Sequence, residues 1–473
     1  MIPQVLIVED DDEYLDVIIS IFDEIGVDCH ITIAQSRDDA KAKLESQFFD
    51  LAILDLKIPT ADGLLDLDPE HGRYVFHLAR KIAPGTKLLV LTGSPSEDFI
   101  SDLLQQKHDA DIWGEGSKVD TVEFLRKIEI DEAPKSIGKA LHAINALDDI
   151  ELDVRSLNLD AAEDRLIRIF AKRFGANRCV VSRIGAGRSG ARTLRLQLFD
   201  DGGAPVQEVV AKLNTLAKIQ DEEARYENGA NLLDRAATPR KMAMLEFGAG
   251  PTAGLFYQLA TGHDHSMYAA IAADDLAAAE AVEATAAALA GWSKGKRETP
   301  STVADVRREW VDDELAKALH ETYSLDWATA FEQRSLQVRS CTVHGDLHGD
   351  NVLVAIGQSV AIIDFGEVGR SVASYDPVSL ELSVLLQENP TIAAWPTADE
   401  CRTWHDLDRY LASCPMPKFV QACRDWAGSV AAGKREVAAS AYTYLLRQLK
   451  YDDTDNVRIL ALLDSVRQLM AST

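Results

Sequence analysis

Two short strings in the C-terminal half place acid and amide side chains at intervals suited to holding a metal-bound nucleotide triphosphate. They are HGDLHGDN at 344–351 and IIDFGE at 362–367. In-line transfer of a γ-phosphoryl group needs one group to orient the acceptor hydroxyl, together with oxygen ligands for Mg²⁺. We expect Asp346 to orient the hydroxyl, and Asn351 and Asp364 to hold the metal.

A glycine-rich turn lies upstream of these strings. Gly185, Gly187 and Gly190 form a G-x-G-x-x-G pattern between two runs typical of strands, 179–184 and 193–199. A dinucleotide-binding fingerprint would open a helix after the glycines, and this one opens a strand. We therefore expect a hairpin, and its place ahead of the two strings resembles that of the phosphate-binding turn of the protein-kinase-like superfamily.

A lysine and an acid follow in an order similar to that of the protein-kinase-like superfamily. The chain returns through a strand at 206–213 that carries Lys212 within VVAK. A helical segment at 221–235 then offers Glu223 and Glu227 as ion-pair partners for that lysine, and we favour Glu223.

The order and spacing of these motifs resemble the protein-kinase-like superfamily, with H-x-D-x-x-x-x-N and D-F-G at its centre. His344 is expected to brace the loop, and His348 to pack rather than react. Gly345 stands where many protein kinases keep an arginine. After D-F-G the chain passes almost directly to a helix at 378–386, which leaves little room for a peptide platform. The pattern thus resembles the aminoglycoside phosphotransferase and choline kinase branch, which implies ATP, Mg²⁺ and a small-molecule hydroxyl acceptor.

The N-terminal region has a different pattern, in which apolar runs end in polar side chains. VLIV at 5–8 is followed by Glu9 and Asp10, and LAIL at 51–54 is followed by Asp55. A third run, 87–91, ends in Thr92. Alternating strands and helices with carboxylates at the strand ends predict a doubly wound parallel sheet with its site at that edge.

The string DLKIPTADG at 55–63 resembles the response-regulator receiver signature. The resemblance implies that Glu9, Asp10 and Asp55 bind Mg²⁺ and that Asp55 accepts a phosphoryl group as an acyl phosphate. Thr92 would be the switching hydroxyl.

Two further receiver positions follow from the same resemblance. Trp113 falls at the place of the aromatic switch, and Lys118 is the nearest candidate for the lysine that pairs with the phosphoryl group. The segment 64–74 is expected to be a loop extension near the phosphorylation face.

Composition narrows the classes of function. The net charge of −27 argues against nucleic-acid or anionic-membrane binding, because phosphate contacts need clustered Lys and Arg. Six cysteines without C-x-x-C spacing indicate neither a zinc site nor a disulfide framework. The alanine-rich run at 269–289 is interrupted by acids, which excludes a membrane span. These features are typical of a cytoplasmic, multidomain protein.

Changes of pattern give the expected organisation: a doubly wound α/β receiver domain at 1–130, and a bilobal protein-kinase-like α+β domain after it. Between them, 131–175 is expected to be a helical connector. The kinase-like part divides into a small nucleotide-binding lobe at 176–262 and a mainly helical large lobe at 263–473.

Further helices are expected from local pattern, among them one at 456–470. The segment 121–128 is predicted to be the last receiver helix, ended by the turn around Pro134. The connector is predicted to hold helices at about 136–147 and 160–174, the second with Asp160 as N-cap and Gly175 as its stop. The segment 442–451 is predicted to help cover the catalytic core.

The sequence therefore predicts a receiver-linked, ATP- and Mg²⁺-dependent phosphotransferase in phosphorelay-type signalling. Its partners would be an upstream histidine kinase or other phosphodonor, a small-molecule acceptor, and proteins that dock on the receiver. The alternative is a non-catalytic signalling adaptor whose second domain binds nucleotide without turnover. The presence of Lys212, Asp346, Asn351 and Asp364 favours the enzyme.

Overall fold

The computed structural model describes residues 1–93, 99, 108–155, 157–184, 192–230, 233–234, 236–259, 262–263, 265–293, 297–355, 357, 359–386 and 395–473. The chain forms two compact units. Unit 1 comprises Met1–Gln220 with Lys241–Gln258, and unit 2 comprises Asp221–Arg240 with Leu259–Thr473. The three glycines of the predicted phosphate-binding turn, Gly185, Gly187 and Gly190, lie outside the described residues.

Unit 1 begins with a five-stranded parallel sheet of order β2-β1-β3-β4-β7. This is one of the two common doubly wound orders, and it is the one found in receivers. The strands are β1 (Gln4–Val8), β2 (His30–Ala34), β3 (Leu51–Leu54), β4 (Lys87–Thr92) and β7 (Val122–Arg126). Because both faces of the sheet are covered, the central strands β1, β3 and β4 carry continuous apolar runs rather than alternating ones.

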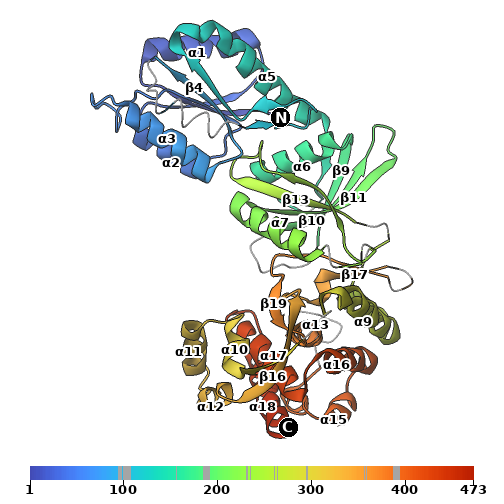
Figure 1. The fold of residues 1–473 in the computed structure, drawn as a ribbon. Coiled ribbons are helices and arrows are strands. Elements are labelled where there is room, and N and C mark those ends of the chain that lie inside the picture. Colours follow the sequence, from blue (N-terminus) through green and yellow to red (C-terminus); the bar gives the residue numbers. More distant parts are fainter. Residues whose placement is uncertain are drawn as a thin grey trace. The chain divides into compact units, whose positions relative to one another are not determined.

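Helices cover both faces of this sheet (Figure 1). Helices α1 (Asp12–Ile25) and α5 (Ala133–Asn145) lie on one face, and α2 (Arg37–Ser46) and α3 (Pro69–Ile82) lie on the other. Asp11 caps α1 by accepting hydrogen bonds from two backbone N–H groups of the first turn, and Gly26 ends the helix with a φ of 67°. A short hairpin, β5 (Asp109–Ala110) and β6 (Val119–Asp120), precedes β7.

A six-stranded sheet of order β12-β13-β11-β10-β9-β8 completes unit 1. It contains β8 (Glu151–Asp153), β9 (Arg178–Arg183), β10 (Arg192–Phe199), β11 (Pro205–Thr215), β12 (Arg240–Leu245) and β13 (Thr252–Gln258), packed against α6 (Ala161–Arg173). Helix α7 (Leu216–Ala230) follows β11. The strands expected on both sides of the glycine-rich turn are thus present, as β9 and β10, and the strand with Lys212 is β11.

The two sheets of unit 1 share one hydrophobic core. Residues of β1 and β3, such as Ile7 and Ile53, belong to the same buried cluster as residues of the six-stranded sheet, such as Leu194 and Phe256. Helix α6 links them, because its Phe170 ring stacks on Phe256 with ring centroids 4.0 Å apart. The two sheets therefore belong to one compact unit.

A buried ion pair fixes α6 to the receiver sheet. Asp50, just before β3, accepts hydrogen bonds from Nε and Nη2 of Arg165, each at 2.7 Å, and from the backbone N–H of Gln4 at 2.8 Å. Both side chains are almost fully buried, at 0% and 3% exposed. Burial raises the pKa of Asp50, while Arg165 opposes that shift.

Backbone contacts join the same two parts. The N–H of Gly85 donates to the carbonyl of Gly250 at 2.9 Å, and the N–H of Gly248 donates to the carbonyl of Gly85 at 2.8 Å. Gly248 has a φ of +91°, and a Cβ there would lie 2.5 Å from the carbonyl oxygen of Ile112. This close approach requires glycine.

Two expectations about this region were wrong. The segment 121–128 is not a helix, because 122–126 forms β7, the fifth strand of the parallel sheet. The connector at 131–175 is not a separate segment either: α5 packs on α1 as the last receiver helix, while β8 and α6 belong to the small-lobe sheet. The two helices predicted there are confirmed, including the Asp160 cap and the stop at Gly175, whose φ is 71°. The predicted loop at 64–74 ends at Asp68, where α3 begins.

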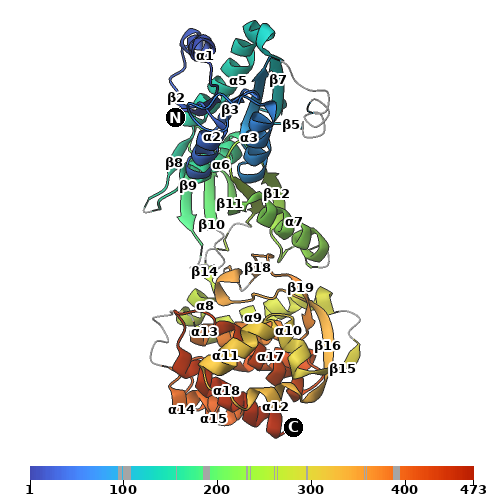
Figure 2. The ribbon, with the colours of Figure 1, turned by 90° about the vertical axis from the view of Figure 1, so that its left-hand side faces the viewer.

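Unit 2 is mainly helical, with short strands (Figure 2). Its strands are β14 (His265–Ser266), β15 (Glu298–Thr302), β16 (Ser335–Val343), β17 (Val352–Val354), β18 (Val360–Ile362) and β19 (Gly369–Val372). The helices are α8 (Met267–Ala273), α9 (Asp275–Leu289), α10 (Val303–Arg308), α11 (Asp313–Thr322), α12 (Ala328–Glu332), α13 (Tyr375–Leu386), α14 (Ala398–Cys401), α15 (Leu407–Leu411), α16 (Pro417–Val430), α17 (Lys434–Gln448) and α18 (Asn456–Ala471). Residues 436–448 of α17 are all buried, so this helix runs through the interior of the lobe. No helix among the described residues is long and apolar enough to cross a membrane.

Candidate functional site

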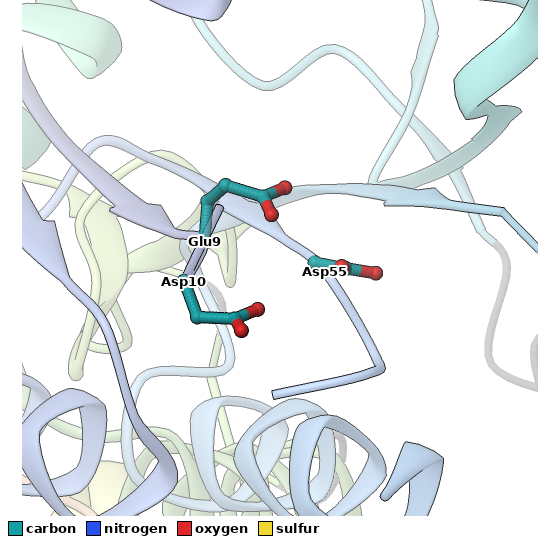
Figure 3. A group of neighbouring side chains, drawn as sticks. All are labelled: Glu9, Asp10 and Asp55. Atoms are coloured by element: carbon teal, nitrogen blue, oxygen red, sulfur yellow. The ribbon is translucent and has the colours of Figure 1, made fainter. Parts of the chain in front are cut away.

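The receiver sheet brings three carboxylates to one edge. Val8 pairs with Leu54, so Glu9 and Asp55 leave adjacent strands side by side, and Asp10 follows Glu9. One oxygen from each of the three side chains lies within 4.8 Å of the others (Figure 3). Hard oxygen donors at this spacing fit Mg²⁺, so the donor set suits the metal expected from the sequence.

Crowding of these carboxylates perturbs their protonation. Burial, followed by the neighbouring charge of Asp55, raises the pKa of Glu9 to about 7, although Lys127 opposes the shift. Burial also raises the pKa of Asp10. A divalent cation would relieve this repulsion, because it favours the ionised form of each ligand.

The lysine at this edge is Lys127, not Lys118. Lys127 lies one residue beyond β7, and its Nζ is 2.7 Å from Oε2 of Glu9 and 2.8 Å from Oδ2 of Asp55. The same ammonium lies over the ring of Tyr14, 4.2 Å from its centroid. Lys118 is exposed in the loop between β5 and β6. The expectation for Lys118 was therefore wrong, and Lys127 supplies the ammonium beside Asp55.

Thr92 lies at the expected edge. It is the last residue of β4, is 2% exposed, and pairs in register with Arg126, the residue before Lys127. Trp113 is elsewhere: it lies in the β5–β6 loop, buried in the core cluster that α6 also joins. The aromatic residue on β7 itself is Phe124, which is half-buried.

In unit 2, a loop after β16 carries the first catalytic string, and α13 braces it. The backbone N–H groups of His344 and Gly345 donate to the two carboxylate oxygens of Asp376, at 2.8 and 3.0 Å. The His344 ring bonds through Nε2 to the carbonyl of Ile363 at 3.0 Å. His344 thus has the bracing contacts that the sequence suggested. Burial raises the pKa of Asp376, whose role the sequence did not indicate.

The β17–β18 hairpin brings the two expected metal ligands to one end. Val352 pairs with Ile362, and the N–H of Ile363 donates to the carbonyl of Asn351 at 3.0 Å. Asn351 therefore lies at the base of the hairpin, next to the strand that leads into Asp364. The amide nitrogen of Asn351 donates to the carbonyl of Asp346 at 2.8 Å, which directs the amide nitrogen into the loop.

Asp364 has an unusual backbone conformation. Its φ is +68°, a left-handed value that costs a non-glycine residue roughly 1 kcal/mol or more. The N–H of Gly366 donates to Oδ1 of Asp364 at 3.3 Å. Such strain is common where a backbone must aim a side chain, and an oxygen ligand for Mg²⁺ is such a case.

Asp346 is half-buried between two basic side chains. Its Oδ2 is 3.8 Å from Nε2 of His348, and its Oδ1 is 3.9 Å from Nη1 of Arg447. His348 also caps the turn that leads to Asn351, because its Nδ1 accepts from the N–H of Asp350 at 3.3 Å. A partly accessible carboxylate held this way can accept a hydrogen bond from a hydroxyl group.

The side chains that the sequence predicts to bind a nucleotide come from two elements. Lys212 is buried on β11, between Thr193 of β10 and Leu255 of β13. On α7, Glu223 is half-buried and Glu227 is exposed, whereas Glu222 is the buried acid. The sequence did not single out Glu222, although it lies three residues after the buried Ile219 and so on the same helix face.

Comparison with family models finds a match to part of the chain. Residues 196–384 match the model of the phosphotransferase enzyme family. That range contains Lys212, Asp346, Asn351 and Asp364. None of the curated proteins compared with the chain matches it.

Similar solved structures fall into two groups. A CheY-like response regulator receiver domain from Methanospirillum hungatei JF-1 is 24% identical, with 30% of this chain and 98% of that chain covered at a TM-score of 0.22. An aminoglycoside-3'-phosphotransferase of type VIII is 19% identical, with 62% of this chain and 99% of that chain covered at a TM-score of 0.34. Aminoglycoside phosphotransferase APH(4)-Ia is 15% identical, with 62% and 89% covered at a TM-score of 0.33.

Proposed function

We propose that this protein is a receiver-linked phosphotransferase that uses ATP and Mg²⁺ to phosphorylate a hydroxyl group of a small molecule. The observation that carries the proposal is the β17–β18 hairpin, which gathers Asp346, Asn351 and Asp364 within the matched range. The short passage from Asp364 to α13 leaves little chain for a peptide platform, which favours a small acceptor.

Each group has a part in the transfer. Asp346 orients the acceptor hydroxyl and takes its proton as the acceptor oxygen bonds to the γ-phosphorus and the bond to the ADP oxygen breaks. Asn351 and Asp364 would hold Mg²⁺, which supplies charge neutralisation on the phosphates. Lys212 would bind the phosphates, oriented by an acid of α7, for which Glu223 is our assignment.

A pair of substitutions tests this division of roles in the full chain. Asp364→Asn should weaken Mg²⁺-dependent ATP binding, whereas Asp346→Asn should spare binding and lower ATP turnover by about 10² to 10³. Asp399→Asn, whose side chain is 95% exposed on α14, is the matched control and should change neither. Wild-type turnover in both site variants would refute the assignment. ATP binding without any turnover in the wild type would instead support a nucleotide-binding adaptor.

We further propose that the receiver takes a phosphoryl group on Asp55 from an upstream histidine kinase or a small phosphodonor and thereby regulates the kinase-like part. The shared core of unit 1 supports this, because a change at the receiver edge can reach the small lobe through packed side chains. Beryllofluoride with Mg²⁺ should change ATP affinity or turnover by a few-fold to about a hundred-fold. Asp55→Asn should abolish the response. Equal values with and without beryllofluoride would make the receiver a recruitment module.

A further inference from the structure

A buried arginine from a distant part of the sequence reaches the loop that carries Asp346. Arg447 lies near the end of α17, and its Nη1 donates to the carbonyl of Gly345 at 2.8 Å. The same nitrogen is 3.5 Å from the hydroxyl of Tyr375 and 3.9 Å from Oδ1 of Asp346. The guanidinium therefore contacts both the backbone and the carboxylate of the catalytic loop.

An aromatic wall fixes the direction of this side chain. Trp310 and Tyr375 stack with ring centroids 4.5 Å apart and planes inclined by 10°, and the guanidinium lies over Trp310 at 5.2 Å from its centroid. The indole N–H of Trp310 donates to the hydroxyl of Ser371 at 3.2 Å, which holds the wall in place. A planar cation packed on a ring has few other orientations available.

Position 345 of the loop has no room for a side chain that could supply this charge. Gly345 has a φ of +79°, and a Cβ there would lie 2.3 Å from the Trp310 ring and 2.5 Å from the carbonyl oxygen of Glu367. A basic side chain at position 345 is thus excluded on steric grounds. The cation arrives instead from α17, 102 residues away along the chain.

The charge state suits a role in holding a carboxylate. Burial alone would lower the pKa of Arg447, but the neighbouring Tyr375 and Asp346 raise it above its ordinary value. An arginine stays protonated throughout the physiological range. Its positive charge attracts the Asp346 carboxylate and opposes rotation of that carboxylate away from the place where the acceptor hydroxyl would lie.

We propose that Arg447 is a positioning residue for phosphoryl transfer, holding the Gly345 backbone and the Asp346 carboxylate in the orientation that receives the acceptor hydroxyl. The proposal rests on the function proposed above, in which Asp346 orients that hydroxyl. In this role Arg447 acts through Asp346 and does not act on the nucleotide.

Three variants of the full chain test the proposal by ATP turnover, with water as the acceptor and release of ADP as the readout. Arg447→Ala should lower kcat by about a hundred-fold and leave the KM and the dissociation constant for ATP within about two-fold of the wild type. Added guanidinium should restore kcat of Arg447→Ala at least about ten-fold, because the vacated site lies beside Trp310. Arg447→Lys should retain part of the lost activity, since it keeps the charge but not the planar group.

Arg424→Ala is the matched control. Arg424 is an arginine of unit 2 whose side chain is 13% exposed; it lies over Trp404, 3.8 Å from the ring centroid, and pairs with Glu381 at 2.5 Å. Its loss should lower stability without lowering kcat of the folded protein, and guanidinium should not raise its kcat. The comparison shows whether a fall in kcat follows from removing any arginine packed on a tryptophan or from removing Arg447 in particular.

The outcomes are distinct. If kcat of Arg447→Ala stays within about three-fold of the wild type, or falls without rescue by guanidinium while ATP affinity falls equally, Arg447 only braces the fold and the proposal is overturned. Absence of ATP turnover in the wild type would overturn the proposed function and this role together. Turnover that is lost in Asp346→Asn but kept in Arg447→Ala would overturn the positioning role alone.

Discussion

The buried pair of Asp50 and Arg165 provides the sharpest test of the link between receiver and small lobe. Arg165→Met removes two hydrogen bonds of 2.7 Å from a carboxylate that is fully buried, and leaves it only the N–H of Gln4. Breaking a buried pair by removing one partner typically costs about 3 to 5 kcal/mol. We expect a loss of that size in the free energy of unfolding of unit 1.

The pH dependence of that loss identifies its cause. Burial already raises the pKa of Asp50 in the folded protein, and removal of Arg165 should raise it further. A folded-state pKa above the unfolded value means that stability is present at low pH and is lost as the pH rises through the folded pKa. The cost of Arg165→Met should therefore be larger at pH 8 than at pH 5, by about 1.4 kcal/mol for each unit of additional pKa shift crossed in that interval.

Urea unfolding of the full chain, followed by hydrogen exchange and mass spectrometry of peptides from β3 and α6, would read unit 1 separately from unit 2. In the double variant, Asp50→Asn should recover at least about 1 kcal/mol of the loss, because no charge is left buried. Arg178→Met is the control, since Arg178 is 45% exposed and its pairs with Glu151 and Asp153 should contribute under about 1 kcal/mol. A cost below 1 kcal/mol for Arg165→Met, independent of pH, would refute this reasoning.

Three further predictions concern unit 1. Because burial raises the pKa of Glu9 to about 7, Mg²⁺ affinity measured by calorimetry should rise roughly ten-fold from pH 6 to pH 8, and Glu9→Gln should bind Mg²⁺ weakly at both pH values. Without Mg²⁺, ionisation of Glu9 should lower the free energy of unfolding as the pH rises from 4.5 towards 7. Lys127→Met should slow formation of the acetyl phosphate adduct on Asp55 at least ten-fold by intact mass, while Lys118→Met should not, and the opposite ranking would restore Lys118. Gly248→Ala should lower the free energy of unfolding by about 2 to 5 kcal/mol, because its Cβ would lie 2.5 Å from the Ile112 oxygen. Gly175→Ala, with a similar positive φ but open space around it, should lower it by about 1 to 2 kcal/mol. Equal losses in urea unfolding would contradict the close contact at Gly248.

Features encoded by short segments could be predicted from the sequence. The apolar runs at 5–8, 51–54 and 87–91 predicted three of the five strands of the receiver sheet, and the residues after two of them predicted Glu9, Asp10 and Asp55 as neighbours. Parallel pairing places successive strand ends at one edge, so no distant information was needed. The strings that carry Asn351 and Asp364 likewise flank two neighbouring strands, β17 and β18.

Lys127 was missed because the β5–β6 hairpin displaces the fifth strand along the chain. Counting onward from Thr92 reached Trp113 and Lys118, which lie in the inserted loop. The segment VEFLR at 122–126 mixes charged and apolar residues, and its half-buried pattern resembles an amphipathic helix as much as a strand. Its pairing with β4 makes the segment a strand, and the sequence of the segment alone does not reveal that pairing.

Contacts between distant residues were beyond prediction for a related reason. Arg447 lies 102 residues from Gly345, and Arg165 lies 115 residues from Asp50. Each arginine shares its helix with at least one other arginine, and its position in the sequence does not mark it as buried. Only the tertiary fold selects which of them is buried against a carboxylate.

The shared core of unit 1 has a consequence for synthesis of the protein on the ribosome. The apolar surface of the receiver at Ile112 and Trp113 is covered by α6, and Phe170 of α6 is in turn covered by Phe256 on β13. Phe256 is made 86 residues after Phe170, which at about 5 to 20 residues per second takes on the order of 10 s. The receiver is therefore the first part to emerge but cannot complete its core until β13 has left the exit tunnel. During that interval its uncovered side is a surface on which chaperones would act and where nascent chains would associate if translation paused.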